Sequence, residues 1–188
     1  MKTLNLTIPR AFACAGILLA LTMPCSLLSQ SKASVELQKS AQVFVQGFYD
    51  WYMPIAQKNN SRPAFNVVLE NKPHLLSPGL FRALEKDSEA ATKSSDLVGL
   101  DFDPFLNSQD PGDPPDHYAV GKVVRKRDSY SVEVFAVHSG EKGKSPVVLP
   151  EIERRNKRWV FANFYYPRSG DLLSTLRLLA KNRRGPAK

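Results

Sequence analysis

The spacing of hydrophobic residues changes at His117, and this change constrains the fold more than any other feature of the sequence. Before His117, apolar residues recur every three or four positions, which is typical of helices with one buried face. After it they recur at every second position, in runs separated by short polar turns, which indicates antiparallel strands. Helices followed by strands predict an α+β domain.

We expect four strands beyond residue 117, joined by short turns into a meander. Pro150 lies in the third strand and cannot donate a backbone hydrogen bond, so that strand should lie at an edge or carry a bulge. The apolar residues that mark the strands are Tyr118, Val120 and Val124 in the first, Tyr130, Val132 and Val134 in the second, and Val147, Leu149 and Ile152 in the third. The fourth is marked by Trp159, Phe161 and Asn163, which alternate with Val160, Ala162 and Phe164.

A long helix is predicted over residues 35–57, with Ser34 as its N-cap. Pro54 should kink or end this helix, because proline lacks the N–H and its ring crowds the preceding turn. Further helices are expected over residues 64–71, from Ser77 and Pro78 onward, and over residues 171–181. The predicted fold is a long N-terminal helix and a second helix packed on a curved four-stranded antiparallel meander sheet, with a C-terminal helix.

Residues 1–33 have the pattern of a secretory signal peptide: a basic head with Lys2 and Arg10, an uncharged apolar run, and a small-residue site ending at Ala33. The run is shorter than the roughly 20 residues that span a bilayer, so no stable membrane span is expected. We therefore expect a secreted or periplasmic protein, cleaved near Ala33. Residues 34–181 then form one α+β domain, and residues 182–188 form a frayed basic tail.

Both cysteines, Cys14 and Cys25, fall in the predicted leader. The mature domain then has no thiol, which excludes thiol catalysis, disulfides and cysteine metal sites. A lipid anchor at Cys25 is not expected, because Pro24 directly before it fits the lipoprotein pattern poorly.

The charge of the mature chain is mildly basic. The sequence carries 26 basic and 18 acidic residues, and the leader holds three of the basic residues and no acid, which leaves +5. This excess permits contact with anionic partners without requiring it. The basic run over residues 154–158 lies in a predicted turn with few aromatic neighbours, so we expect no nucleic-acid binding.

Three segments carry a resemblance to a known family: Phe48-Tyr49-Asp50-Trp51-Tyr52 on the first helix, residues 100–110, and Tyr118 to Gly121. They resemble the bacterial exported domain-of-unknown-function family 3828, which is similar to the cystatin-like and nuclear-transport-factor-2-like cone folds. The resemblance covers residues 43–166. It implies a curved sheet wrapped around a long helix and an exported location, and it implies no reaction.

Aromatic residues of the first helix and the last strand are candidates for a pocket between helix and sheet, because ligand sites are mostly apolar with a few polar groups. The alternative is core packing, in which buried Tyr and Trp residues bond to Asp50 or Asn163. The candidate pocket residues are Tyr49, Asp50, Tyr52, Trp159 and Tyr165.

The long loop over residues 96–116 offers Asp101, Asp103 and Asp110 as a candidate site, since carboxylates are the ligands that calcium prefers. Their spacing does not match the twelve-residue calcium loop. The favoured interpretation is that Asp side chains cap turns while Phe102, Phe105 and Leu106 pack onto the core. The three histidines show no metal-ligand spacing, and we predict no metal site and no cofactor.

No catalytic set is evident, so the leading hypothesis is an exported, non-catalytic binding domain for an unknown protein or small ligand. The alternative is a small periplasmic enzyme that uses Asp50 or Asp101 as an acid or base in an apolar pocket, where burial raises a carboxyl pKa. The sequence leaves the oligomeric state open.

Overall fold

The computed structural model describes residues 26–58, 62–93, 99–109 and 114–183. Most of the predicted leader, Asp110 and the last five residues lie outside these ranges. The elements are α1 (Ser26–Ala56), α2 (Phe65–Asn71), the 3-10 helix η1 (Pro73–Leu75), α3 (Pro78–Lys93), β1 (His117–Arg125), β2 (Ser129–His138), β3 (Glu141–Lys142), β4 (Leu149–Arg155), β5 (Arg158–Tyr166), β6 (Gly170–Asp171) and α4 (Leu172–Arg183).

The sheet is antiparallel, with the strand order β1-β2-β4-β5-β6 and with β3 paired to β2. The α+β prediction is confirmed, and the four predicted strands are consecutive neighbours. The predicted number of strands was too small, because the two-residue strands β3 and β6 add to the sheet. Both arise where the chain turns back beside β2 and β5, so their pairing depends on position rather than on a hydrophobic pattern.

Pro150 does not mark an edge strand, because β4 lies between β2 and β5. The regular β2–β4 ladder stops at the pair Ser131–Glu151, and the strands meet again only at Val134 and Val148. The missing N–H of proline is therefore accommodated by a gap in the ladder inside the sheet.

A bulge at Ala162 determines which side chains of β5 face the core. Glu151 pairs with Asn163 and Ile152 pairs with Phe161, so Ala162 is an extra residue in β5. The alternation shifts there, and the prediction that Asn163 shares a face with Phe161 was wrong. Four aromatic residues of β5 belong to the core instead: Trp159, Phe161, Phe164 and Tyr166.

Helix α1 is longer than predicted and begins at Ser26. Ser34 therefore lies inside the helix and is not its N-cap; no Gly or Pro follows Ser26 until Gly47, so no residue interrupts the early turns. As expected from Pro54, the helix ends within the same turn, at Ala56.

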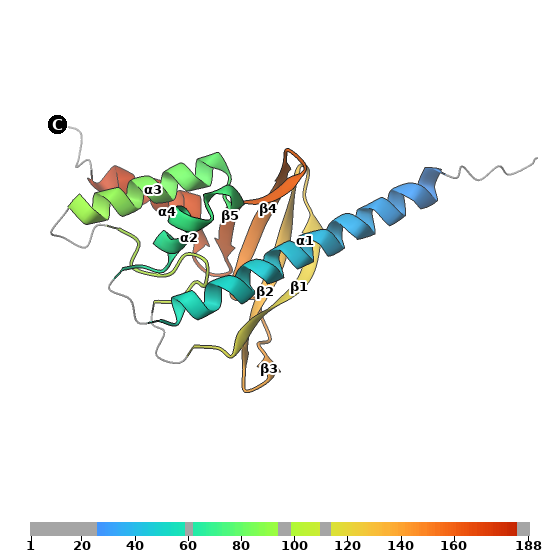
Figure 1. Ribbon diagram of the computed structural model, residues 1–188, viewed down its shortest axis with the longest axis horizontal. Helices are drawn as coiled ribbons and strands as arrows, with labels where there is room; N and C mark the ends of the chain where they lie inside the picture. The colour runs from blue at the N-terminus through green and yellow to red at the C-terminus, as the bar shows by residue number, and fades with distance from the viewer. Residues whose placement is uncertain (1–25, 59–61, 94–98, 110–113, 184–188) are drawn as a thin grey trace, which may run out of the picture.

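Figure 1 shows α1 crossing the sheet in front of β1 and β2, with its first turns projecting beyond the sheet. Helices α2, α3 and α4 gather toward β5, where α3 and α4 pack against each other and against that strand. The core fills the space between α1 and the sheet. Its largest fully buried aromatic side chains are Tyr49, Tyr52, Phe105, Phe161 and Phe164.

The outer edge of β1 bonds to side chains of α1. The Gln46 amide donates to the carbonyl of Tyr118 over 2.8 Å and accepts from the N–H of Val120 over 2.9 Å. The Gln42 amide donates to the carbonyl of Gly121 over 2.9 Å. These bonds fix α1 along the strand and set which of its faces points into the core.

Both ends of α4 are held by carboxylates. Asp171 accepts the N–H of Ser174 over 3.0 Å and so caps the start of the helix. Burial raises the pKa of Asp171, but hydrogen bonds from Asn163 and Ser174 outweigh burial and hold it below its ordinary value. At the other end Arg183 pairs with the buried Asp87 of α3, which extends α4 beyond its predicted end at Lys181.

Candidate functional site

The loop that contains Asp103 is folded around this carboxylate. One oxygen, Oδ1, accepts the N–H groups of Phe105 and Leu106 over 2.9 and 3.1 Å. The other, Oδ2, accepts the hydroxyl of Tyr52 over 2.5 Å. The carboxylate thus caps a turn, as the favoured sequence interpretation proposed.

Three tyrosines from α1 and β5 bind this loop, and we call Tyr49, Tyr52 and Tyr166 the tyrosine clamp. Beside the Tyr52 bond, the hydroxyl of Tyr49 donates to the carbonyl of Phe105 over 2.9 Å. The hydroxyl of Tyr166 donates to the carbonyl of Pro104 over 2.9 Å. The clamp holds the loop against the core.

Phe105 fills the space beneath the loop and is fully buried. Its ring makes edge contacts with Phe48 at 5.4 Å and with Tyr52 at 5.2 Å between ring centroids. Phe102 and Leu106 pack against the same core. The loop is therefore anchored through its apolar side chains, as the sequence indicated.

Burial controls the protonation of this region. It raises the pKa of Asp103, although the hydrogen bonds from Tyr52 and the two loop N–H groups oppose the rise. Burial also raises the pKa of Tyr118 to about 12, with a smaller effect from the charge of Asp103, and raises those of all three clamp tyrosines. The clamp hydroxyls therefore remain protonated donors near neutral pH.

The other aspartates of the candidate loop site do not join Asp103. Asp101 is exposed and accepts a 3.3 Å hydrogen bond from Gln109. Asp110 lies outside the described residues. Within the described ranges, no group of three or more His, Cys, Asp or Glu side chains is arranged to hold a metal ion.

The five predicted pocket residues do not line one cavity. Tyr49 and Tyr52 are in the core, while Asp50 is exposed and accepts a 2.8 Å hydrogen bond from Gln46. Trp159 donates to the hydroxyl of Ser40 over 2.9 Å, far along α1 from Tyr52. Tyr49 and Tyr52 thus lie in the core beneath the loop, Asp50 lies on the surface, and Trp159 lies in the part of the core near Ser40.

Tyr165, the fifth residue, faces the other side of the sheet, because it alternates with the inward-facing Phe164 and Tyr166. Its hydroxyl donates to Glu151 over 3.2 Å, and Lys126 lies 4.7 Å from its ring centroid. It is part of a surface cluster and does not approach α1.

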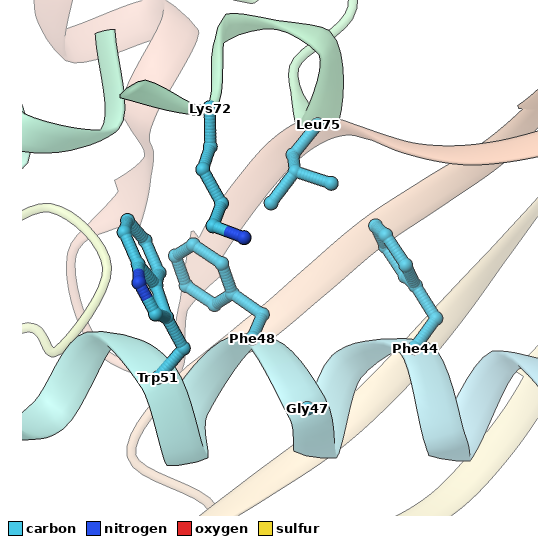
Figure 2. Close-up of a pocket in the computed structure, with 6 residues that line it drawn as sticks. All are labelled: Phe44, Gly47, Phe48, Trp51, Lys72 and Leu75. Carbon is cyan, nitrogen blue, oxygen red and sulfur yellow. The ribbon is translucent and has the colours of Figure 1, made fainter. Parts of the chain in front are cut away.

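A groove of about 170 Å³ opens instead between α1 and the segment that joins α2 to η1. We call it the aromatic groove. Figure 2 shows Phe44 and Phe48 rising on either side of Gly47, with Leu75 facing them and Lys72 reaching toward α1 beside Trp51. Its lining residues are Phe44, Gly47, Phe48, Trp51, Lys72 and Leu75.

The rings of the groove are fixed by the core but remain partly accessible. Phe48 is buried, and its ring packs 4.7 Å from that of Phe161. Phe44 and Trp51 are half-buried, and the Phe44 ring also lies against Phe161, at 4.9 Å. The amine of Lys72 lies 5.0 Å from the centroid of the Trp51 ring, within cation–π range.

Gly47 leaves the floor of the groove open. A Cβ added at this position would meet no atom within 4 Å, so packing does not require glycine. Its backbone is helical, and it is not one of the described glycines with positive φ, so conformation does not require it either. A glycine inside a helix costs about 0.5–1 kcal/mol relative to alanine. The chain tolerates this cost where a side chain would begin to close the groove.

Sequence reasoning missed Phe44, Gly47, Lys72 and Leu75 as site residues. The interior helical glycine between aromatic residues at three- and four-residue spacing was a usable signal. Lys72 and Leu75 had none, because they meet α1 only through the tertiary fold.

A second, wider cavity of about 440 Å³ lies between α2 and α3. Its lining is largely polar, and its charges are partly paired: Arg62 contacts Glu70 at 2.6 Å and Lys93 contacts Glu89 at 3.7 Å. A smaller share of its lining is apolar than in the aromatic groove.

Comparison with known proteins finds no relative. No family model, curated protein or solved structure matches the chain. The resemblance to family 3828 stays a prediction. Within the described residues, no helix combines the length and apolarity that crossing a membrane requires.

Proposed function

We propose that this protein is an exported, non-catalytic binding domain whose ligand site is the aromatic groove. The observation that carries the proposal is a partly open apolar groove with a glycine floor and a lysine at its rim. Ligand sites combine apolar walls with few polar groups, and this groove has that composition.

The alternative, a small periplasmic enzyme that uses Asp50 or Asp101, has less support. Both carboxylates are exposed, and neither lines the groove. The alternative depends on burial in an apolar site to raise the pKa of the catalytic carboxyl, and neither residue has that environment. The half-buried Asp103 has its oxygens occupied by Tyr52 and by backbone N–H groups.

Export is compatible with the length of α1. Cleavage near Ala33 would remove the first turns of the helix, yet among the side chains of α1 that the structure describes, from Lys32 onward, the first in the buried core is Ala41. The core contacts would survive processing. Expression of the full chain in a bacterium with a periplasm, followed by N-terminal sequencing of the purified protein, tests this part. We expect a periplasmic protein starting near Ser34, and a cytoplasmic protein with Met1 intact would contradict export.

Binding is tested by NMR with a library of small aromatic and aliphatic fragments. We expect shifts of backbone amides to cluster at residues 44–51 and 72–75. Gly47→Leu should abolish them, because the new side chain fills the floor, while helix content is kept. Shifts that cluster around Asp101, or shifts at residues 44–51 and 72–75 that persist in this variant, would contradict the proposed site.

A further inference from the structure

We propose that the aromatic groove takes one apolar side chain of an acidic peptide, and that Lys72 pairs with an Asp or Glu carboxylate next to that side chain. This inference rests on the proposed function of the same groove, and it adds the chemical class of the partner.

The size of the groove favours a side chain over a whole small molecule. Small-molecule sites usually have roughly 300–1,000 Å³ and enclose most of the ligand. The aromatic groove has about 170 Å³ and lies at the surface. A space of this size suits a single anchoring side chain whose backbone stays outside, as in peptide recognition by grooves along a helix.

The walls of the groove match the residues that dominate protein–protein binding. Phe44, Phe48 and Trp51 supply aromatic surface, and aromatic side chains are enriched where a partner residue is buried. Phe48 is fixed by its contacts with Phe105 and Phe161. The floor at Gly47 has no side chain, which lets an incoming group approach the helix backbone.

The charge at the rim selects the partner. Lys72 is half-buried, with its amine over the Trp51 ring, and no carboxylate of the described chain forms an ion pair with it. None of the other lining residues is charged. A carboxylate beside the anchoring side chain would therefore meet one uncompensated cation in an apolar setting, which is electrostatic complementarity.

The test uses acetylated, amidated hexapeptides with Leu, Phe or Ala at the third position and Glu, Gln or Lys at the fourth, titrated by NMR against the purified protein. We expect Leu and Phe peptides to bind more tightly than Ala peptides. Glu peptides should bind about two- to fivefold more tightly than Gln peptides, as for a partly exposed ion pair, and Lys peptides most weakly.

A charge reversal makes the test specific. Lys72→Glu should invert the order, so that Lys peptides bind better than Glu peptides. Lys86→Glu, a matched reversal at an exposed position of α3 outside the groove, should leave the order unchanged. Gly47→Leu should lower the affinity for every peptide at least tenfold. The thermal midpoint of this variant should stay at or above that of the wild type.

The outcomes separate this inference from the proposed function. Equal affinities for Glu, Gln and Lys peptides, or an unchanged order in Lys72→Glu, overturn the acidic partner. Laurate that shifts the groove amides when no peptide does overturns the peptide in favour of an anionic amphiphile. If fragments bind the groove and no peptide does, the inference is overturned and the proposed function is retained. If neither fragments nor peptides bind, both the inference and the proposed function are overturned.

Discussion

The tyrosine clamp and the aromatic groove are built on the same helix, and they differ in how completely their groups are occupied. At the clamp, each hydroxyl has an acceptor, Asp103 has three donors, and Phe105 fills the space beneath the loop. At the groove, the floor is empty above Gly47 and Lys72 has no carboxylate partner in the described chain. A polar cluster whose bonds are all made internally holds the fold together, whereas an open apolar surface with an unpaired charge is available to a ligand.

The largest difference between the two regions should appear when an aromatic ring is removed. Phe105→Ala should lower the free energy of unfolding by about 3–5 kcal/mol, since the ring is fully buried. Phe44→Ala should cost roughly 1–2 kcal/mol, because its ring is only half-buried. Urea unfolding measures both, and equal losses would remove the distinction.

Loss of one clamp hydroxyl should have a smaller but measurable effect. Tyr52→Phe leaves Oδ2 of the half-buried Asp103 without its donor, which should cost about 1–3 kcal/mol of unfolding free energy. Tyr165→Phe removes a hydroxyl on the other side of the sheet, where water can replace it, and should change stability by less than about 0.5 kcal/mol. A negligible effect of Tyr52→Phe would contradict a structural role for the clamp.

The pH dependence of the unfolding free energy should report the titration of the Asp103 carboxyl. Because burial raises its pKa in the folded state, the protonated carboxyl favours folding. This contribution is fully present below the ordinary carboxyl pKa of about 3.9 and is lost as the pH rises through the raised value. Asp103→Asn cannot titrate, and its amide can still accept the two loop N–H bonds.

The wild type should therefore lose stability relative to Asp103→Asn as the pH rises from 4 to 7. Urea unfolding of both proteins at four pH values gives the difference. A rise of wild-type stability relative to Asp103→Asn over this interval would mean that the hydrogen bonds to the carboxylate outweigh its burial.

The smallest change should come from filling the empty floor of the groove. Gly47→Ala should raise the unfolding free energy by about 0.5–1 kcal/mol, because alanine favours the helix and its Cβ meets no atom. The control is Gly121→Ala, whose Cβ would lie 2.5 Å from the Phe135 ring and should destabilise the protein by roughly 1–3 kcal/mol. A loss of stability in Gly47→Ala would show that the floor is packed.

Much of the fold was predictable because its strands follow a period of two and its turns carry polar residues. The extra residue at Ala162 was not, because Val160 to Phe164 are all apolar except Asn163, so no change of polarity marks the shift and only the pairing with β4 shows it. The start of α1 at Ser26 was missed because that segment also fits the end of a signal peptide.

The candidate site was predictable only in part. The turn-capping role of Asp103 follows from local chemistry, and it was anticipated. The helix residues Tyr49, Asp50 and Tyr52 were predicted to line one pocket, but Tyr49 and Tyr52 enter the core and Asp50 is exposed. Their neighbour Trp51 lines the groove instead. The opposite wall comes from Lys72 and Leu75, whose approach to α1 depends on long-range packing that no local pattern encodes.

Gln42 and Gln46 occupy backbone groups of β1 that an outermost strand would otherwise offer to another chain. Free N–H and C=O groups along a sheet border are a template for strand addition and aggregation. Since these bonds come from side chains of a helix, they are lost together whenever that helix lifts from the sheet. Local melting of α1 would thus expose an unpaired sheet edge, to which an extended segment of a second copy could add as a strand.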